Sequence, residues 1–323
     1  MMNFVTGATG QIGTVLVREL CKRNENTRIL VRKNSKLGAL RDLPLEIVVG
    51  DILDKNSLQQ AMKGADNVFH LAGLMPTKQG ADKMMSGVNA DGTRYICEAA
   101  LESGVKKLVY VSTVQIFSRN EKGIIDEEVP LDLNSLSGSY QSSKVEATLT
   151  VLEMAKRGLD AVVICPSGVI GISDCPTKDE MTKALLTFAS GKVNLVVKGA
   201  FDFVDVRDVV QGLIAARNKG RSGEVYILTG TRVTITELHR ITQQVAGVTA
   251  QRLVIPNWLA YSGVALMQKL LPLMGINSGY NRYTLQVLQG NSFYSSEKAR
   301  RELSFVPRLL EESIYDCLHL HNK

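Results

Sequence analysis

A glycine-rich turn near the N-terminus constrains the fold more than any other feature of this sequence. A short β-branched run at Asn3–Val5 leads into the segment TGATGQIG at 6–13, and an amphipathic helical pattern follows. In such turns one glycine permits a tight bend, a second lets the backbone approach a pyrophosphate, and a third lets the helix pack on the strand. The helix N-terminus then offers unpaired N–H groups and a partial positive charge to phosphates. We therefore predict a dinucleotide-binding loop made of Gly7, Thr9, Gly10, Gln11, Ile12 and Gly13.

The pattern of apolar runs indicates that this turn opens a doubly wound parallel α/β sheet of the Rossmann type. Short strands are expected at 3–5, 28–31, 46–49, 67–71, 107–111 and 161–165, with helices at 11–23, 57–62, 82–103 and 140–157. This alternation favours a parallel sheet covered on both faces, with ligands at the edge where the strands end. We expect a dinucleotide-binding domain over residues 1–166. A smaller, mostly helical substrate lobe is expected over 167–323, with some segments returning to the first domain.

The end of the second expected strand indicates which dinucleotide binds. An NAD site usually has an acidic residue about twenty residues beyond the glycines, which binds the ribose 2′-hydroxyl, whereas an arginine accommodates the 2′-phosphate of NADP. No Asp or Glu occurs between Glu25 and Asp42, but Arg32 and Lys33 end this strand, and Lys36 follows. We therefore expect NADP(H) to be preferred, with Arg32 on the phosphate and Lys33 or Lys36 assisting. NAD(H) stays an alternative.

Two further strand ends are expected to contact the dinucleotide. Asp51, followed by Ile52, ends the third strand, where its carboxylate either accepts a hydrogen bond from the adenine amino group or caps a turn. Small residues after the fourth strand let the backbone approach the cofactor, in the segment Leu71, Ala72 and Gly73. His70 precedes that segment, and a packed strand histidine explains it better than a catalytic base.

The residues after the fifth expected strand carry acid–base chemistry. Tyr140 and Lys144 lie four residues apart at the start of a helix, so they share one face. A nearby ammonium is expected to lower the phenol pKa. A hydroxyl from Thr113, for which Ser112 is a rival, would stabilise charge on the substrate oxygen. We therefore expect Thr113, Tyr140 and Lys144 to move a proton to or from an oxygen while hydride moves to or from nicotinamide.

These motifs together resemble those of extended short-chain dehydrogenase/reductases, the NAD-dependent epimerase/dehydratase superfamily, over essentially the whole chain. The matching segments are TGATGQIG at 6–13, GDI at 50–52, HLAG at 70–73, VNADGT at 88–93, VYVST at 109–113, YQSSK at 140–144, CPSGVIG at 165–171 and VDVRDVV at 204–210. The resemblance implies a catalytic triad of Thr113, Tyr140 and Lys144, with Asn89 helping to fix the site. It implies contacts to the nicotinamide carboxamide from Pro166, Ser167 and Val169. Because the family's catalytic hydroxyl is usually the second of the Ser–Thr pair, the resemblance also favours Thr113.

Three branches of the superfamily compete for this chain. Nucleotide-sugar dehydratases place Asp-Glu directly after the catalytic Thr, where this chain has Val114-Gln115. Nucleotide-sugar epimerases commonly carry an Arg where this chain has Phe201, and a phenyl ring cannot pair with a diphosphate. Resemblance to dihydroflavonol reductases and 3β-hydroxysteroid dehydrogenases implies a mostly apolar ketone or alcohol. The apolar stretch 258–274 fits such a substrate, or it packs on the core. Arg282 keeps an epimerase as the alternative. A non-catalytic NADP-sensing regulator is less favoured, because such proteins typically lose the Tyr or the Lys.

Composition supports the remaining expectations. The chain is 45% hydrophobic and 22% charged, as ordinary soluble globular proteins are. The net charge of +6 is modest, and a cofactor explains the one dense basic stretch, so no nucleic acid partner is expected. The five cysteines and four histidines lack metal-ligand spacing, so we expect reduced thiols, no metal and a cytoplasmic enzyme. The stretch 258–274 is too short and too interrupted to span a membrane. A small-molecule substrate is the expected partner, and a homodimer is allowed.

Overall fold

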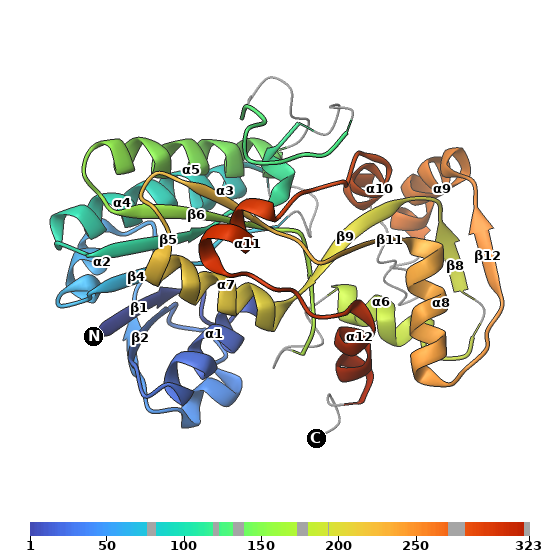
Figure 1. Cartoon of the computed structure of the whole chain (residues 1–323), viewed down its shortest axis with the longest axis horizontal. Helices are drawn as coiled ribbons and strands as arrows, with labels where there is room; N and C mark the ends of the chain where they lie inside the picture. Colours follow the sequence, from blue (N-terminus) through green and yellow to red (C-terminus); the bar gives the residue numbers. More distant parts are fainter. Residues whose placement is uncertain are drawn as a thin grey trace.

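Seven parallel strands form the central sheet of the computed structural model, which describes residues 1–75, 82–118, 123–131, 139–172, 180–192, 194–270 and 282–319 (Figure 1). The strand order is β10-β6-β5-β4-β1-β2-β3. The strands are β1 (Met2–Thr6), β2 (Asn26–Val31), β3 (Glu46–Val49), β4 (Asn67–His70), β5 (Lys107–Val111), β6 (Ala161–Pro166) and β10 (Val225–Leu228). The predicted doubly wound parallel sheet is confirmed.

Both faces of this sheet are buried at its centre, which explains why central strands such as β5 and β6 are mainly apolar. Successive residues of a strand point to opposite faces, and neighbours such as Phe4 and Val5 belong to separate hydrophobic clusters. One face is covered by α2 (Lys55–Met62), α4 (Gly92–Glu102) and α5 (Ser139–Lys156), and the other by α1 (Gln11–Lys22), α7 (Val206–Lys219) and α11 (Glu297–Leu303) (Figure 1). The predicted helices of the first half of the chain are confirmed, except that a short helix, α3 (Asp82–Ser86), and one π-helical turn, η2 (Gly87–Asp91), precede α4.

The chain beyond β6 contains more strands than the sequence analysis predicted. A three-stranded sheet has the order β11-β9-β7, from β7 (Gly168–Ile170), β9 (Ala200–Asp205) and β11 (Thr231–Thr234). A parallel pair joins β8 (Asn194–Val197) to β12 (Arg252–Ile255). Around them lie α6 (Glu180–Phe188), α8 (Ile235–Ala246), α9 (Asn257–Leu270), α10 (Arg282–Gln289) and α12 (Leu310–His319). Among the described residues, no helix is long and apolar enough to cross a membrane.

β10 returns from this part of the chain to the central sheet. It pairs in parallel with β6, so that Val225 lies opposite Val163. The preceding helix α7 packs on α1, and β10 thereby extends the sheet by one strand. The division of the chain into a dinucleotide-binding domain and a substrate lobe stays a prediction.

A buried ion pair connects α7 to the start of the sheet. The side chain of Arg217 is 5% exposed and forms two hydrogen bonds with the Glu25 carboxylate and one with the Asn3 amide oxygen. Asn3 donates in turn to Glu25 and accepts from Asn67 of β4. Partial burial raises the pKa of Glu25, but the hydrogen bonds from Arg217 and Asn3 outweigh it, and the pKa is lowered.

We expect Glu25→Gln to lower the free energy of unfolding at pH 7 by about 2 kcal/mol, because the guanidinium of Arg217 would then be buried without a counter-ion. A carboxylate with a lowered pKa stabilises the fold above its unfolded pKa of about 4.3, and this contribution disappears as the pH falls through the folded pKa. Urea unfolding at pH 7 and pH 3 measures both effects. The control is Glu153→Gln, whose 63% exposed side chain pairs with the exposed Lys156, and it should change little. Equal effects of the two substitutions would contradict the prediction.

Candidate active site

The glycine turn places the N-terminus of α1 at the edge where the strands end. Gly7 has a φ of +71°, and a Cβ there would lie 2.6 Å from the backbone nitrogen of Ala72. A Cβ on Gly13 would lie 2.2 Å from the Gly7 carbonyl oxygen. Gly10 begins the helix without a side-chain cap, and no acidic residue lies in the first turn of α1. At its glycines the turn therefore lets a ligand approach the backbone closely. The positive end of α1 lies behind it, and this arrangement fits a pyrophosphate.

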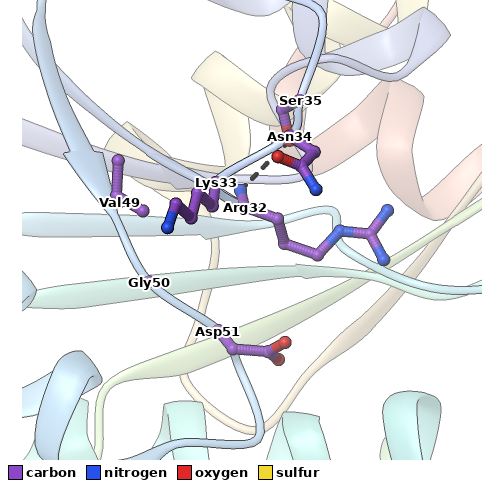
Figure 2. A pocket seen from close by; sticks show the side chains of 7 residues that line it. All are labelled: Arg32, Lys33, Asn34, Ser35, Val49, Gly50 and Asp51. Atoms are coloured by element: carbon purple, nitrogen blue, oxygen red, sulfur yellow. Dashed lines mark hydrogen bonds between the residues drawn. The ribbon is translucent and has the colours of Figure 1, made fainter.

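A pocket of about 550 Å³ lies beside this turn at the ends of β2 and β3. It is lined by Arg32, Lys33, Asn34, Ser35, Val49, Gly50 and Asp51 (Figure 2). The Arg32 backbone N–H donates to Ser35 Oγ at 3.1 Å and shapes the turn. Figure 2 shows the side chains of Arg32 and Lys33 extending in opposite directions. Both are exposed, and within the described part of the chain the Arg32 guanidinium has no hydrogen-bond or ion-pair partner.

The neighbouring predicted cofactor residues have structural contacts of their own. Asp51 Oδ1 accepts a hydrogen bond from the backbone N–H of Leu53 at 3.0 Å, which is the turn-capping role considered for it. Ile52 is 9% exposed and packs against Gly92 of α4, where a Cβ would lie 2.7 Å from its Cδ1. Asp51 nevertheless lines the pocket (Figure 2), whereas the side chain of Ile52 belongs to the core.

Asn89 connects the segment after β4 to the catalytic helix. Its Oδ1 accepts from the backbone N–H of Leu74 at 2.7 Å, and its Nδ2 donates to the Leu74 carbonyl and to Ser143 Oγ, each at 3.0 Å. Ser143 Oγ donates to the carbonyl oxygen of Tyr140 at 2.8 Å. Asn89 lies in the π-helical turn η2, a local distortion that is frequent at functional sites. It therefore holds the segment after Leu71, Ala72 and Gly73 against α5.

Tyr140, Lys144 and Thr113 are all buried where β5 and α5 meet, with exposures of 7%, 6% and 8%. The Lys144 ammonium donates to the Val111 carbonyl at 2.8 Å and lies 4.5 Å from the centre of the Tyr110 ring. Thr113 caps the 3₁₀ turn η3 (Val114–Ile116). The three predicted catalytic residues thus come together from the end of one strand and the first turns of one helix.

Burial controls the protonation of this pair. Desolvation raises the pKa of Tyr140 to about 12, although hydrogen bonding with Thr113 lowers it. Desolvation lowers the pKa of Lys144 to about 7. The expected lowering of the phenol pKa by the ammonium is therefore wrong for the protein alone, because the cost of burying the phenolate outweighs the attraction of a neighbouring charge. At neutral pH Tyr140 is a protonated acid.

The two rival residues have other partners. Ser112 Oγ shares a hydrogen bond with Thr148 of α5 at 2.8 Å. His70 is fully buried, with Nδ1 2.7 Å from Thr6 Oγ1 and Nε2 3.0 Å from Thr93 Oγ1. Desolvation and the charge of Lys144 lower the pKa of His70 to about 3. It is a neutral packed histidine, as the sequence analysis preferred, and the geometry leaves Thr113 as the hydroxyl beside Tyr140.

The segment after β6 crosses into the smaller sheet. Pro166 ends β6 opposite Leu228, and Val169 of β7 pairs with Val204 of β9. Ser167 is 8% exposed, and within the described part of the chain its buried hydroxyl has no hydrogen-bond partner. Asp202 is buried, and desolvation raises its pKa. Asp202 accepts from the backbone N–H of Gly230 at 2.9 Å. This connection was not expected from sequence.

The residues from which the substrate class was predicted differ in their burial, and some of them lie outside the described part of the chain. Phe201 is 6% exposed and packs edge-to-face on Phe203 and Tyr294, so it is a core residue without charge. Trp258 and Leu259 of α9 are 71% and 46% exposed. Ala260 of the same helix is 8% exposed and Tyr261 packs against the core, so the described part of α9 packs on the core through one face. The side chains of 264–270 and of Arg282, and residues 271–274, lie outside the described part of the chain.

Two residues at the site were missed by sequence reasoning. The hydroxyl of Tyr283, from α10, donates to Oε1 of Gln115 in η3. The Tyr283 ring meets that of Tyr140 edge-to-face, with ring centres 6.0 Å apart. Gln115 entered the sequence analysis only because it stands in the Asp-Glu segment of the dehydratases. Nothing in the sequence around Tyr283 indicates its contact with a turn 168 residues away.

Comparisons with known proteins place this chain in a family. Residues 3–228 match the NAD dependent epimerase/dehydratase family. Sterol demethylase protein B of Methylococcus capsulatus is 31% identical over 98% of this chain and 97% of its own length. A putative dihydroflavonol 4-reductase of Synechocystis is 29% identical over 98% and 93%. The crystal structure of gox2253 is 31% identical and superposes with a TM-score of 0.85 over 99% and 98% of the two chains. The chain therefore belongs to the NAD-dependent epimerase/dehydratase family of extended short-chain dehydrogenase/reductases and is an NAD(P)-dependent enzyme.

Proposed function

We propose that this protein is an NADP(H)-dependent oxidoreductase that interconverts a mostly apolar ketone and its alcohol, with Tyr140 as the acid and base. The observation that carries the proposal is the buried group of Tyr140, Thr113 and Lys144 at the strand edge that also holds the glycine turn. The family is established, and the cofactor preference, the residue roles and the substrate class are what we propose.

The residues of the chain fit a dinucleotide. The turn around Gly7, Gly10 and Gly13 would hold the pyrophosphate, the pocket at Arg32 the ribose 2′-phosphate, and Lys144 the nicotinamide ribose. Asp51 lines the same pocket, where the adenine would bind. Contacts to the nicotinamide carboxamide are proposed for Pro166, Ser167 and Val169. The bound dinucleotide would supply or accept the hydride.

The protein side chains handle the proton. Thr113 and Tyr140 would hold the substrate oxygen between their hydroxyls and orient the carbon that reacts. In the reductive direction the oxygen gains negative charge, which these donors stabilise in a buried site. Tyr140 then transfers its phenolic proton to that oxygen. The raised pKa of Tyr140 keeps the proton in place until it is needed, which favours the reductive role.

Charge supports an apolar substrate over a nucleotide sugar. A buried diphosphate needs cationic or multiple N–H partners, and Phe201 supplies neither at the position where epimerases carry Arg. Two of the relatives are named for a sterol and a dihydroflavonol. A nucleotide-sugar epimerase with tightly bound NAD is the competing function, because the family includes epimerases and dehydratases. A cytoplasmic location and a homodimer stay predictions.

The test of the function combines a substrate panel with one substitution. We expect NADPH oxidation with hydrophobic ketones and no conversion of UDP- or dTDP-sugars. Tyr140→Phe should lower kcat by about 100-fold or more, because general acid catalysis contributes on that scale, while the Kd for NADPH changes less than threefold. Tyr315→Phe, at a 53% exposed tyrosine, is the control. Epimerisation of a nucleotide sugar without any ketone reduction would reverse the choice of function.

We expect NADPH to bind more tightly than NADH and Arg32→Ala to remove most of that difference. The guanidinium lies at the pocket without a described partner, and charge-assisted hydrogen bonds to phosphate are strong. The Kd of NADPH should rise at least tenfold, and that of NADH should stay nearly constant, by fluorescence titration. Arg300→Ala, an exposed arginine of α11, controls for the loss of one positive charge. Tighter binding of NADH by the unaltered protein would overturn the preference.

We expect Lys144→Met to inactivate the enzyme yet stabilise its fold at neutral pH. The pKa of Lys144 is about 7 when folded and about 10.4 when unfolded. Between these values the unfolded chain binds more protons, so stability rises with pH, and the cost of burying the ammonium is greatest below pH 7. The gain should be on the order of 3 kcal/mol at pH 6 and smaller at pH 9. Urea unfolding measures it, with the exposed Lys156→Met of the same helix as control. A destabilised Lys144→Met protein at pH 6 would refute this account.

A further inference from the structure

Gln115 and Tyr283 meet beside the catalytic tyrosine from two distant parts of the chain. Gln115 lies in η3, two residues after Thr113, and its backbone N–H donates to Thr113 Oγ1 at 3.3 Å. Tyr283 lies in the first turn of α10, and its ring packs edge-to-face on the Tyr140 ring at an interplanar angle of 84°. The Tyr283 hydroxyl donates to Gln115 Oε1. The backbone of Gln115 is thus bonded to Thr113, and its side-chain amide is bonded to a tyrosine that packs on Tyr140.

This contact engages the amide oxygen of Gln115 and leaves its amide nitrogen available to a ligand. Oε1 accepts from Tyr283, and among the described residues Gln115 Nε2 has no hydrogen-bond partner. Both Gln115 and Tyr283 are half-buried, so a ligand can reach them while water has limited access. A half-buried N–H₂ group with a fixed orientation gains most when an oxygen acceptor enters beside it.

A purely structural role explains this arrangement less well. If Gln115 only connected η3 to α10, we would expect both polar ends of its amide to have protein partners and both side chains to be shielded from solvent. Instead the pair is partly open, on the same side as Tyr140, and it occupies the place that a carboxylate takes in the dehydratase motif. An amide there cannot act as an acid or base, but it can donate a hydrogen bond.

We propose that Gln115 is a substrate-specificity residue, whose Nε2 donates a hydrogen bond to a second substrate oxygen on the carbon next to the reacting carbonyl. Tyr283 is a positioning residue, because its hydroxyl fixes which end of the amide faces the substrate. The inference rests on the proposed function, since Tyr140 and Thr113 take the first oxygen. It narrows the substrate class to apolar ketones with a vicinal carbonyl or hydroxyl oxygen.

The experiment uses two matched probes, benzil and deoxybenzoin, which differ by one carbonyl oxygen. Selectivity is the ratio of kcat/KM for benzil to that for deoxybenzoin with NADPH. Intrinsic reactivity cancels when the selectivity of a variant is divided by that of the unaltered protein. We expect Gln115→Met and Gln115→Glu to lower selectivity about tenfold, the effect of one neutral hydrogen bond. Tyr283→Phe should lower it less, because the ring stays and only the orienting hydroxyl is lost. Gln286→Met, at an exposed glutamine of α10, should leave it unchanged.

Calorimetric titration of the same probes separates this inference from the function on which it rests. The unaltered protein should bind benzil more tightly than deoxybenzoin, and Gln115→Met should remove that difference. If neither ketone is reduced, the proposed function fails, but the two Kd values still decide the role of Gln115. Equal binding of the two probes by the unaltered protein would overturn the inference. So would equal losses of benzil and deoxybenzoin turnover in Gln115→Met, because a structural role affects both probes alike.

Discussion

The contact between the glycine turn and the end of β4 is the constraint on which the site depends. No side chain fits between Gly7 and the backbone of Ala72, or between Gly13 and the Gly7 carbonyl. That closeness brings the N-terminus of α1 to the strand edge, beside the segment that Asn89 attaches to α5. The Tyr140–Lys144 helix is therefore positioned relative to the phosphate cradle by one short path of contacts. A Cβ at either glycine would separate the two halves of the site.

Much of the central fold could be predicted from sequence because its strands are buried on both faces. In runs such as 107–111 the residues after the first are apolar or aromatic, so the pattern indicates a buried strand. Each strand end also carries one motif. The three-stranded sheet could not be predicted for the opposite reason. β9 carries Asp202 and Asp205 inside a buried strand, and only the structure shows that the Gly230 N–H and Arg207 bind those carboxylates. Short strands with internal charges look like loops until their partners are known.

The candidate site could also be predicted from sequence only in part. Residues in local motifs, such as Tyr140 and Lys144, could be selected from their spacing together with their place after the fifth strand of a fold that opens with a glycine turn. Their protonation could not, because it depends on how completely the fold removes water. Sequence reasoning considered the attraction between neighbouring charges, whereas desolvation dominates both pKa values. The role of Tyr283 could not be predicted from sequence, because its contact joins α10 to the turn η3, which lies 168 residues earlier in the chain.

The buried ammonium of Lys144 lowers the stability of the fold, and the chemistry of the site requires it. Lys144 is held by one carbonyl and an aromatic ring, and among the described residues no carboxylate pairs with its ammonium. In contrast, Arg217 donates to both oxygens of the Glu25 carboxylate and also to Asn3. Residues retained for folding are paired in this way. A buried charge without such pairing persists only where the chemistry requires it, and here it lies one helical turn from Tyr140.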